Sequence, residues 1–342
     1  MKASKSLFKI IVLPSKFHKG YVAHFICDFI DGLKEKGWYV LDSDTDIKTS
    51  NILDDIYKAT GVHRKPDILA FYILRKEKLF LWKNLKKLNC LKVLILEDLH
   101  RKIDKEAFIY ATKWANVIFS RYPNATQWVV RNQKKDFRYY FNLNRNKIKY
   151  FNLYHGATND FINELNFSNK INKVFLSGAL STIYYELREK GKQLMTDSDT
   201  IIIRKHPGYK EVIDSKKEVF NYAIEISKFK IAIGDQGSIP NSDAPYILAK
   251  NFEIPAAGTA LITHEGLVPF LRELGFVENY NFIAANPDNL LDKIEHWLRP
   301  ENQLELNKIT IRGQELVLDK HMNEHRINFF NKKVIQLVDE KI

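Results

Sequence analysis

The stretch KNFEIPAAGTALITHEG, residues 250–266, decides the fold because it joins a short helical turn to a buried strand. The small residues before Gly258 predict the end of the helical turn, and the apolar run after Thr259 predicts the strand. Polar side chains follow the strand directly, beginning near His264. Glu253 is the one carboxylate of the helical turn, and a buried charge is costly unless it is paired or hydrogen-bonded. We therefore expect Glu253 either to be exposed or to hold a ligand.

The same alternation of apolar strands and helices runs through the whole chain. The predicted strands are residues 7–14, 38–42, 66–74, 91–98, 115–122 and 147–154 in the first half, and 172–180, 199–208, 229–238, 259–266 and 280–287 in the second half. Near-continuous apolar strands separated by helices are typical of parallel sheets covered on both faces. The sequence therefore predicts an α/β fold of two doubly wound, Rossmann-like domains that face each other across a cleft.

A change of pattern divides the chain into the two predicted domains. The polar stretch 156–172 has no strong periodicity and is the expected linker. We predict an N-terminal domain over residues 1–160 and a C-terminal domain over residues 161–320. Residues 321–342 are predicted to form a terminal helix that packs back on the N-terminal domain.

The composition is that of a globular protein in a reducing compartment. The 342 residues have 45% hydrophobic content, which allows a full core in each domain. The two cysteines, Cys27 and Cys90, match no disulfide framework or metal-ligand spacing. No apolar run approaches the roughly 20 residues that span a bilayer, and the basic N-terminus is expected to form the first strand, not a signal peptide. We therefore predict a cytoplasmic protein.

The net charge of +12 is compatible with nucleic acid, an anionic membrane surface or a small anionic ligand as partner. The basic residues are spread along the chain, and their densest groups lie in residues 75–92 and 131–149. The sequence has no zinc-finger, helix-turn-helix or RNA-recognition pattern, so we predict no nucleic-acid partner. Peripheral contact with an anionic membrane stays open, next to the alternative of a lysine-rich solvated surface.

Open parallel sheets bind ligands at the carboxyl ends of their strands, so the residues that follow the strands are the site candidates. In the second half these residues are cations, glycines and polar groups, namely Gly178, Ala179, Arg204, Lys205, His206, Gly234, Asp235, Gln236, Thr263, His264, Glu265 and Gly266. Cations and free backbone N–H groups suit a diphosphate. Glu253 suits the two adjacent hydroxyls of a ribose, because a carboxylate accepts two hydrogen bonds at once.

The segment from Lys250 to Arg326 resembles the C-terminal half of GT-B glycosyltransferases, and in particular the spore-maturation-type glycosyltransferase-like (glycosyl transferases group 1) family. That family has a basic residue, an aromatic residue, a glutamate and a small-residue turn to glycine before a strand. Lys250, Phe252, Glu253 and Gly258 match this order. Three further segments are similar to the family in pattern: FLSGALSTIYYELR (175–188), FNLYHGATNDF (151–161) and the N-terminal glycine loop at Gly20.

The resemblance implies a glycosyltransferase that moves a hexosyl or pentosyl group from a nucleoside-diphosphate sugar, with UDP or GDP, to a hydroxyl of a glycan or glycoconjugate acceptor. It implies that residues 161–320 bind the nucleotide sugar and that residues 1–160 bind the acceptor. No cofactor beyond the donor and no metal are expected. The substrate-binding residues expected from the resemblance and the strand ends are Gly20, Gly178, Tyr185, Arg188, His206, Gly234, Gln236, Lys250, Phe252, Glu253, Gly258, Thr259 and His264.

The expected catalytic residues come from both domains. Asp98, which ends the strand at 91–98, or His100, which follows it, would accept the proton of the acceptor hydroxyl. Both also fit structural roles, as a helix cap and as a satisfied core histidine. Arg204 and Lys205 directly follow an apolar strand and would stabilise the negative charge of the leaving diphosphate.

The resemblance also favours retention of configuration at the transferred sugar. Many retaining GT-B enzymes have an additional glutamate eight residues before the one that Glu253 matches. That position is Pro245 in this chain, and Asp243 is near but out of register.

Two alternative functions stay open. Asp42 ends the strand at 38–42 and Asp44 follows it, and an Asp-x-Asp motif at the end of a strand could hold Mg²⁺ or Mn²⁺ in a metal-dependent GT-A glycosyltransferase. The alternative of a polar loop explains the same residues, and a GT-A fold does not explain a second α/β half. The second alternative is a non-catalytic GT-B module that binds nucleotide sugars or glycans.

Overall fold

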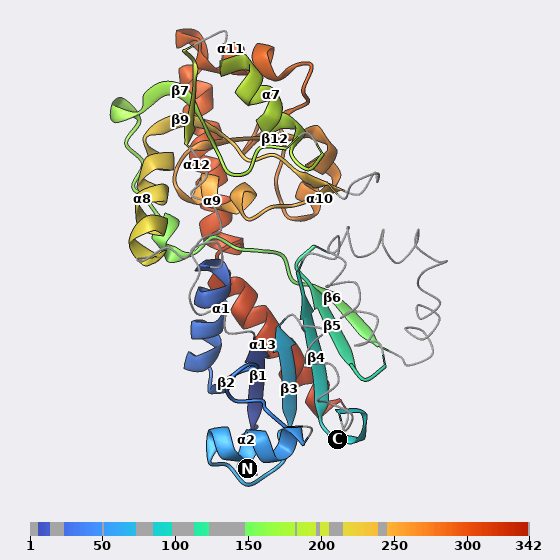
Figure 1. The fold of residues 1–342 in the computed structure, drawn as a ribbon. Helices are drawn as coiled ribbons and strands as arrows, with labels where there is room; N and C mark the ends of the chain where they lie inside the picture. Colours follow the sequence, from blue (N-terminus) through green and yellow to red (C-terminus); the bar gives the residue numbers. More distant parts are fainter. Residues whose placement is uncertain are drawn as a thin grey trace. The chain divides into compact units, whose positions relative to one another are not determined.

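The computed structural model describes residues 6–13, 24–49, 51–72, 85–97, 113–122, 148–181, 183–195, 199–204, 215–238 and 245–340. The chain divides into two compact units. Unit 1 comprises Met1–Lys19, Ile26–Tyr154 and Arg326–Ile342, and unit 2 comprises Gly20–Phe25 and His155–His325. Each unit is built around its own parallel sheet (Figure 1). This agrees with the prediction of two doubly wound α/β halves.

The sheet of unit 1 has six strands in the order β2-β1-β3-β4-β5-β6, and every neighbouring pair is parallel. The strands are β1 (Lys9–Leu13), β2 (Trp38–Asp42), β3 (Ile68–Tyr72), β4 (Leu91–Leu96), β5 (Val117–Ser120) and β6 (Lys149–Asn152). The residues of β1, β3, β4 and β5 are all buried, as expected for a parallel sheet covered on both faces. All six strands lie within the predicted ranges.

Helices cover this sheet and use aromatic side chains as contacts. The described helices of unit 1 include α1 (His24–Glu35), α2 (Ile52–Thr60), the 3-10 turn η4 (Leu85–Lys87) and the C-terminal part of α13 (Asn323–Asp339). Phe330 of α13 packs against Phe29 of α1, Trp38 of β2 and Phe119 of β5, at centroid distances of 5.6, 5.6 and 4.9 Å. Through these contacts Phe330 of α13 belongs to the core of unit 1.

The sheet of unit 2 has the strand order β13-β12-β9-β7-β8 and is also parallel throughout. Its strands are β7 (Ile171–Ser177), β8 (Ile201–Arg204), β9 (Phe229–Ile233), β12 (Ala260–His264) and β13 (Ile283–Ala285). A short antiparallel ladder that the sequence did not predict joins β10 (Gly237–Ser238) to β11 (Pro245–Tyr246). The two-residue strands of this ladder are too short to give a sequence pattern.

Helices surround the sheet of unit 2 in the positions that a doubly wound sheet requires. They are α7 (Glu186–Met195), α8 (Ser215–Ser227), α9 (Lys250–Ala256), α10 (Val268–Glu273), α11 (Leu290–Leu298) and α12 (Gln303–Lys320), with 3-10 turns η5 (Asn159–Phe161), η6 (Phe167–Asn169), η7 (Glu265–Leu267) and η8 (Pro300–Asn302). Side chains of β7, β9 and β12 form one buried cluster with α7, α11 and α12. The predicted helical turn of residues 250–258 is α9, and Gly258 ends it with a positive φ of 68°.

None of the helices described for this chain is both long enough and apolar enough to cross a membrane.

Candidate functional site

The candidate site lies at the carboxyl edge of the sheet of unit 2. Three neighbouring strands of this sheet carry the candidate residues at their ends: β7 lies in the middle, with β9 on one side and β8 on the other. Because the three strands are parallel, their carboxyl ends lie at the same edge. Gly178, Arg204 and Gly234 therefore come close together there, as the sequence predicts.

Arg188 of α7 is buried and joins two of these strand ends. Its backbone N–H donates to Oδ2 of Asp235 at 2.9 Å, and its Nε and Nη2 donate to the carbonyl oxygen of Gly234 at 3.2 and 2.8 Å. Its Nη1 lies 3.4 Å from the carbonyl oxygen of Ala179. The guanidinium also lies over the ring of Tyr185, 4.3 Å from the centroid. Arg188 therefore fixes the loops after β7 and β9 and leaves a positive charge between them.

Lys250, the first residue of α9, brings a second cation to the end of β7. Its Nζ donates to the hydroxyl of Ser177 at 3.2 Å and to the hydroxyl of Tyr222. It also lies over the Tyr222 ring, 4.4 Å from the centroid. Gly178 leaves room for both cations, because a Cβ at this position would lie 2.9 Å from Nη1 of Arg188 and 3.0 Å from Cε of Lys250.

Arg204 brings a third cation from the end of β8. Its guanidinium lies over the ring of Tyr222 at 5.0 Å, and its Nη1 pairs with Oε2 of Glu225 at 3.2 Å. We call Arg188, Lys250 and Arg204 the cation cluster. Lys205, which was predicted to act with Arg204, lies outside the described residues.

The electrostatics of the cation cluster favour an anionic ligand. Burial lowers the pKa of Lys250 to about 7, the Glu253 carboxylate opposes this shift, and the positive charges of Arg188 and Arg204 add to it. An anion placed beside Lys250 would restore the charged form of the ammonium. The cluster therefore has the chemistry that a phosphate group needs.

The loop after β9 adds buried polar atoms to this edge of the sheet. Asp235 has a positive φ of 69°, and its Oδ1 accepts the N–H of Gln236 at 2.7 Å. Burial raises the pKa of Asp235, and the Arg188 charge opposes the shift. Within the described part of the chain, the side-chain oxygens of Gln236 and Asn251 are buried and accept no hydrogen bond. Asn251 donates its Nδ2 to Thr263 at 2.8 Å, so its Oδ1 is left for another donor.

Glu253 is buried, with 4% of its surface exposed, and lies in the first turn of α9. The first of the two expectations for this residue, an exposed carboxylate, is therefore wrong. Its charge acts on Lys250, one turn earlier in the same helix. Glu253 therefore lies near the cation cluster. Ribose binding by Glu253 stays a prediction.

His264 lies at the carboxyl end of β12, as expected. Its Nδ1 accepts the N–H of Gly266 at 3.0 Å, so the proton of the neutral ring is on Nε2. Nε2 faces Oε2 of Glu186 at 3.7 Å. His264 is thus held by its neighbours at the edge that carries the cation cluster.

Three predicted binding residues have structural contacts away from this edge, so we leave them out of the candidate site. Phe252 is fully buried against Phe276 and His321, with centroids at 6.1 and 5.4 Å. Thr259 precedes β12 and so lies at the amino edge, where its hydroxyl donates to the carbonyl oxygen of Phe229 at 3.2 Å. A Cβ at Gly258 would lie 2.7 Å from Cδ2 of Leu165, so close packing alone accounts for a glycine at this position.

Several other predicted site residues cannot be placed. Asp98, His100, Gly20 and His206 lie outside the described residues.

The Asp-x-Asp motif after β2 is engaged in its own turn. Oδ1 of Asp42 accepts the N–H groups of Asp44 and Thr45 at 2.6 and 3.1 Å, and Oδ2 of Asp46 accepts the N–H of Asp42 at 2.7 Å. Among the residues whose placement is described, no group of three or more His, Cys, Asp or Glu side chains could hold a metal ion. The two-sheet architecture also differs from the GT-A alternative that Asp42 and Asp44 suggested.

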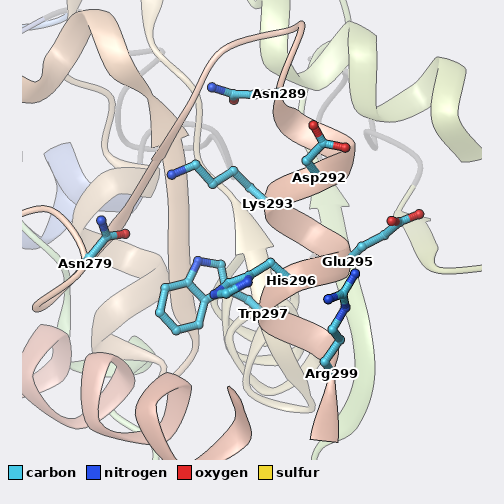
Figure 2. A pocket seen from close by; sticks show the side chains of 8 residues that line it. All are labelled: Asn279, Asn289, Asp292, Lys293, Glu295, His296, Trp297 and Arg299. Carbon is cyan, nitrogen blue, oxygen red and sulfur yellow. The ribbon is translucent and has the colours of Figure 1, made fainter. Parts of the chain in front are cut away.

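Figure 2 shows a pocket lined mostly by residues of α11. No residue of the cation cluster lines it. It is lined by Asn279, Asn289, Asp292, Lys293, Glu295, His296, Trp297 and Arg299. The charges of its lining are mixed, two acidic and two basic, and none of the predicted site residues takes part. We therefore place the candidate site at the strand ends.

The sequence did not reveal three side chains of the site: Ser177, Tyr222 and Asn251. Ser177 ends β7 directly before Gly178, so its position at a strand end was an available signal. Asn251 follows Lys250 in the quoted motif but reads as an ordinary polar residue of a helix. Tyr222 lies in the middle of α8, where nothing in the sequence separates it from a core aromatic residue.

The chain was compared with known proteins. A family model described as "Glycosyl transferase-like" matches residues 204–332, from the end of β8 into α13. No curated protein sequence matches the chain.

Solved structures of glycosyltransferases match nearly the whole chain. An alpha-glucosyltransferase (AGT) in complex with UDP is 10% identical with a TM-score of 0.64, over 96% of this chain and 100% of that one. The catalytic domain of starch synthase IV from Arabidopsis thaliana, bound to ADP and acarbose, is 11% identical with a TM-score of 0.61, over 98% and 100%. A glycosyltransferase from Rickettsia africae is 13% identical with a TM-score of 0.57, over 98% and 99%. The chain therefore has the GT-B fold of glycosyltransferases, and its residues 204–332 match the glycosyl transferase-like family model.

Proposed function

We propose that this protein is a glycosyltransferase and that unit 2 binds a nucleoside-diphosphate sugar at the cation cluster. The observation that carries the proposal is the meeting of Arg188, Lys250 and Arg204 at the carboxyl ends of β7 and β8. A diphosphate is the anion that this edge binds in nucleotide-binding α/β folds. The UDP and ADP in the solved structures with this fold support the same ligand class.

The buried acceptor atoms near the cluster suit the rest of a nucleotide sugar. A ribose or a hexose offers hydroxyl donors, and the side-chain oxygens of Gln236 and Asn251 accept nothing within the described residues. Glu253 would accept two hydrogen bonds from the ribose hydroxyls. The nucleotide would be UDP or GDP, and the transferred group a hexosyl or pentosyl unit.

The reaction consists of one substitution at the anomeric carbon of the sugar. The bond between this carbon and the diphosphate oxygen breaks, and the oxygen of an acceptor hydroxyl forms the new bond on the same face of the sugar, as a single substitution with retention requires. The electron pair of the broken bond stays on the diphosphate, where Lys250 and Arg204, with Lys205, would stabilise it. The proton of the hydroxyl passes to a base, for which Asp98 and His100 are the candidates in unit 1. Arg188 is a positioning residue, because its N–H groups are directed to backbone carbonyls.

We also propose that the reaction retains the configuration of the sugar and that the chain belongs to the spore-maturation-type group of glycosyltransferases. Both proposals rest on the match of Lys250, Phe252, Glu253 and Gly258 to the family pattern. Analysis of the anomeric proton of the product by NMR tests the first one. A product of inverted configuration would contradict it.

The experiment that tests the function measures the release of nucleoside diphosphate from a panel of UDP- and GDP-sugars, with simple glycans as acceptors and excess chelator present. We expect release with at least one donor, and no loss on chelation, because the cation cluster takes the place of a metal ion. Loss of activity with chelator and rescue by Mn²⁺ would instead support the metal-dependent alternative at Asp42 and Asp44. Tight nucleotide binding without turnover would support the non-catalytic module.

A further inference from the structure

Tyr222 of α8 contacts two of the three side chains of the cation cluster. Nζ of Lys250 lies over its ring, 4.4 Å from the centroid, and the guanidinium of Arg204 lies over the same ring at 5.0 Å. The Tyr222 hydroxyl also accepts a hydrogen bond from Nζ of Lys250. One aromatic side chain therefore connects the start of α9 to the end of β8.

The Tyr222 ring is held by the core of unit 2. The residue is buried, and its ring packs edge-on against Phe161 at 5.8 Å and lies 6.4 Å from the ring of Phe175. Lys250 and Arg204 are only partly buried, so a ligand can reach them. A ring that is fixed by the core can thus serve as the support on which the two cations rest.

The two cations need such a support because they repel each other. Burial lowers the pKa of Lys250 to about 7, and the Glu253 carboxylate opposes this shift. The charges of Arg188 and Arg204 lower the pKa further, which is the effect of like charges close together. The π face of a tyrosine attracts a cation, so Tyr222 offsets part of the repulsion between Lys250 and Arg204.

The hydroxyls of Tyr222 and Ser177 fix the direction of the Lys250 amine. Nζ donates to both of them, to that of Ser177 at 3.2 Å, and the two hydroxyl oxygens lie 2.8 Å apart. A neutral amine has two N–H donors, and these two acceptors use both. The charged ammonium has a third N–H, to which the described residues offer no further acceptor. Because the N–H bonds are arranged tetrahedrally, the two hydroxyls determine where the third one points.

We propose that Tyr222, with Ser177, is a positioning residue of the transfer reaction: it keeps Lys250 and Arg204 together and directs the third N–H of Lys250 to the diphosphate. The inference rests on the proposed function for the identity of this anion. The effect of Tyr222 on Lys250 is a property of the protein alone, so it can be tested without any nucleotide.

The first test measures the titration of Lys250 in the full-length protein without nucleotide. The pH dependence of acetylation of this amine by acetic anhydride is followed by mass spectrometry. Tyr222→Phe keeps the ring and removes an acceptor that stabilises the charged amine, so the midpoint of the profile should move down by about 0.5–1 pH unit. Ser177→Ala should move it in the same direction. A midpoint that neither variant changes would overturn the proposal.

Tyr280→Phe is the matched control. Tyr280 of unit 2 also lies under a guanidinium, that of Arg312 at 4.2 Å, and this guanidinium does not belong to the cation cluster. The substitution should leave both the acetylation profile of Lys250 and the affinity for UDP at wild-type values. A purely structural role for Tyr222 predicts that Tyr222→Phe lowers the melting temperature and changes neither of these two quantities.

The second test compares UDP affinities by calorimetry in Tyr222→Phe, Lys250→Met and the double variant. Tyr222→Phe should weaken binding about fivefold to tenfold in the wild-type background. It should have less than about a twofold effect in the Lys250→Met background, because the hydroxyl acts through the lysine. The same factor in both backgrounds would contradict the proposal.

Failure of the proposed function is distinguishable from failure of this inference. If the wild type binds neither UDP nor GDP, the proposed function fails, and the assignment of the third N–H to a diphosphate fails with it. A shifted acetylation profile in Tyr222→Phe would still show that Tyr222 controls Lys250. If UDP binds and the profile does not shift, the proposed function stands and the positioning role of Tyr222 is wrong.

Discussion

Arg188 donates two hydrogen bonds to the carbonyl oxygen of Gly234, from Nε at 3.2 Å and from Nη2 at 2.8 Å. This fork joins the first turn of α7 to the end of β9 across the carboxyl edge of the sheet. Since the backbone N–H of the same residue donates to Asp235, one side chain and its own amide fix the whole loop. The positions of Gly234 and Gln236 therefore depend on Arg188.

Arg188→Lys should weaken both the fold and the site. Lysine keeps the charge but cannot form the planar fork, so at least one buried hydrogen bond is lost. We expect a loss of about 1–3 kcal/mol in the free energy of unfolding and an affinity for UDP that is lower by about tenfold or more. Urea denaturation and calorimetry measure the two effects. Lys192→Gln, an exposed position on the same helix, is the control and should change neither. Equal UDP affinity in Arg188→Lys and wild type would show that the fork does not position the site.

Gly178→Ala tests the close packing of the cation cluster. Gly178 has a φ of 102°, and a Cβ there would lie 2.9 Å from Nη1 of Arg188 and 3.0 Å from Cε of Lys250. The matched control is Gly61→Ala, because Gly61 has a φ of 68° and open space around its Cβ position. Both variants should lose about 1–2 kcal/mol of stability from backbone strain. Only Gly178→Ala should also weaken UDP binding, and equal UDP affinity in the two variants would contradict the described packing.

Nucleotide binding should take up a proton at Lys250. In the free protein burial holds the pKa of this ammonium near 7, and a bound diphosphate should raise it. Below pH 7 Lys250 is charged in both the free and the UDP-bound protein, so its titration changes the UDP affinity little. As the pH rises from 7 toward the higher pKa of the complex, affinity should fall by up to about tenfold per pH unit. Calorimetry of UDP binding at pH 8 in buffers of different ionisation enthalpy measures the proton uptake.

Lys250→Met should abolish this proton uptake as well as weaken binding. Lys308→Met is the control, because Lys308 is an exposed cation of unit 2 that pairs with Glu305 at 3.0 Å. It should leave both the affinity and the proton uptake at wild-type values. Undiminished proton uptake in Lys250→Met would assign the titration to a different group.

Glu253→Gln should reduce discrimination between ribose and deoxyribose. The change keeps the shape but replaces a charged acceptor with a neutral amide, so UDP affinity should fall roughly 10- to 100-fold. The wild type should bind 2′-deoxy-UDP more weakly than UDP, and the variant should distinguish the two less well. If Glu253 serves only to pair with Lys250, the variant should lose thermal stability with unchanged discrimination. Melting temperatures and both affinities, measured on the two proteins, separate these outcomes.

The fold could be predicted from the sequence because buried parallel strands are read directly as apolar runs. The range 91–98 contains β4 (Leu91–Leu96), whose residues are all buried, and Gly37 ends α1 with a φ of 77° as its position after the periodic run suggested. The ladder between β10 and β11 could not be predicted. Two-residue strands are too short to show a period in the sequence.

The site could be predicted only where strand ends determine it. Gly178, Arg204 and Gly234 come together because the parallel sheet places them at one edge. Phe252 stands in the matching motif and Thr259 directly follows it, yet Phe252 lies in the core and Thr259 at the opposite edge of the sheet. A linear motif cannot tell which face of a short helix points to the ligand. Tyr222 lies outside the motif, and the sequence did not reveal it because its contact with Lys250 depends on how α8 packs on the sheet.

The central claim is that unit 2 binds the nucleotide at the cation cluster, and hydrogen exchange tests it most directly. The full chain is compared with and without saturating UDP, with Lys250→Met as the matched variant. We predict slower exchange in the wild type at the loop after β7, the first turn of α7, the loop after β9 and the start of α9, and no such change in the variant. Protection confined to the strand ends of unit 1, or equal protection in the wild type and Lys250→Met, would contradict the account.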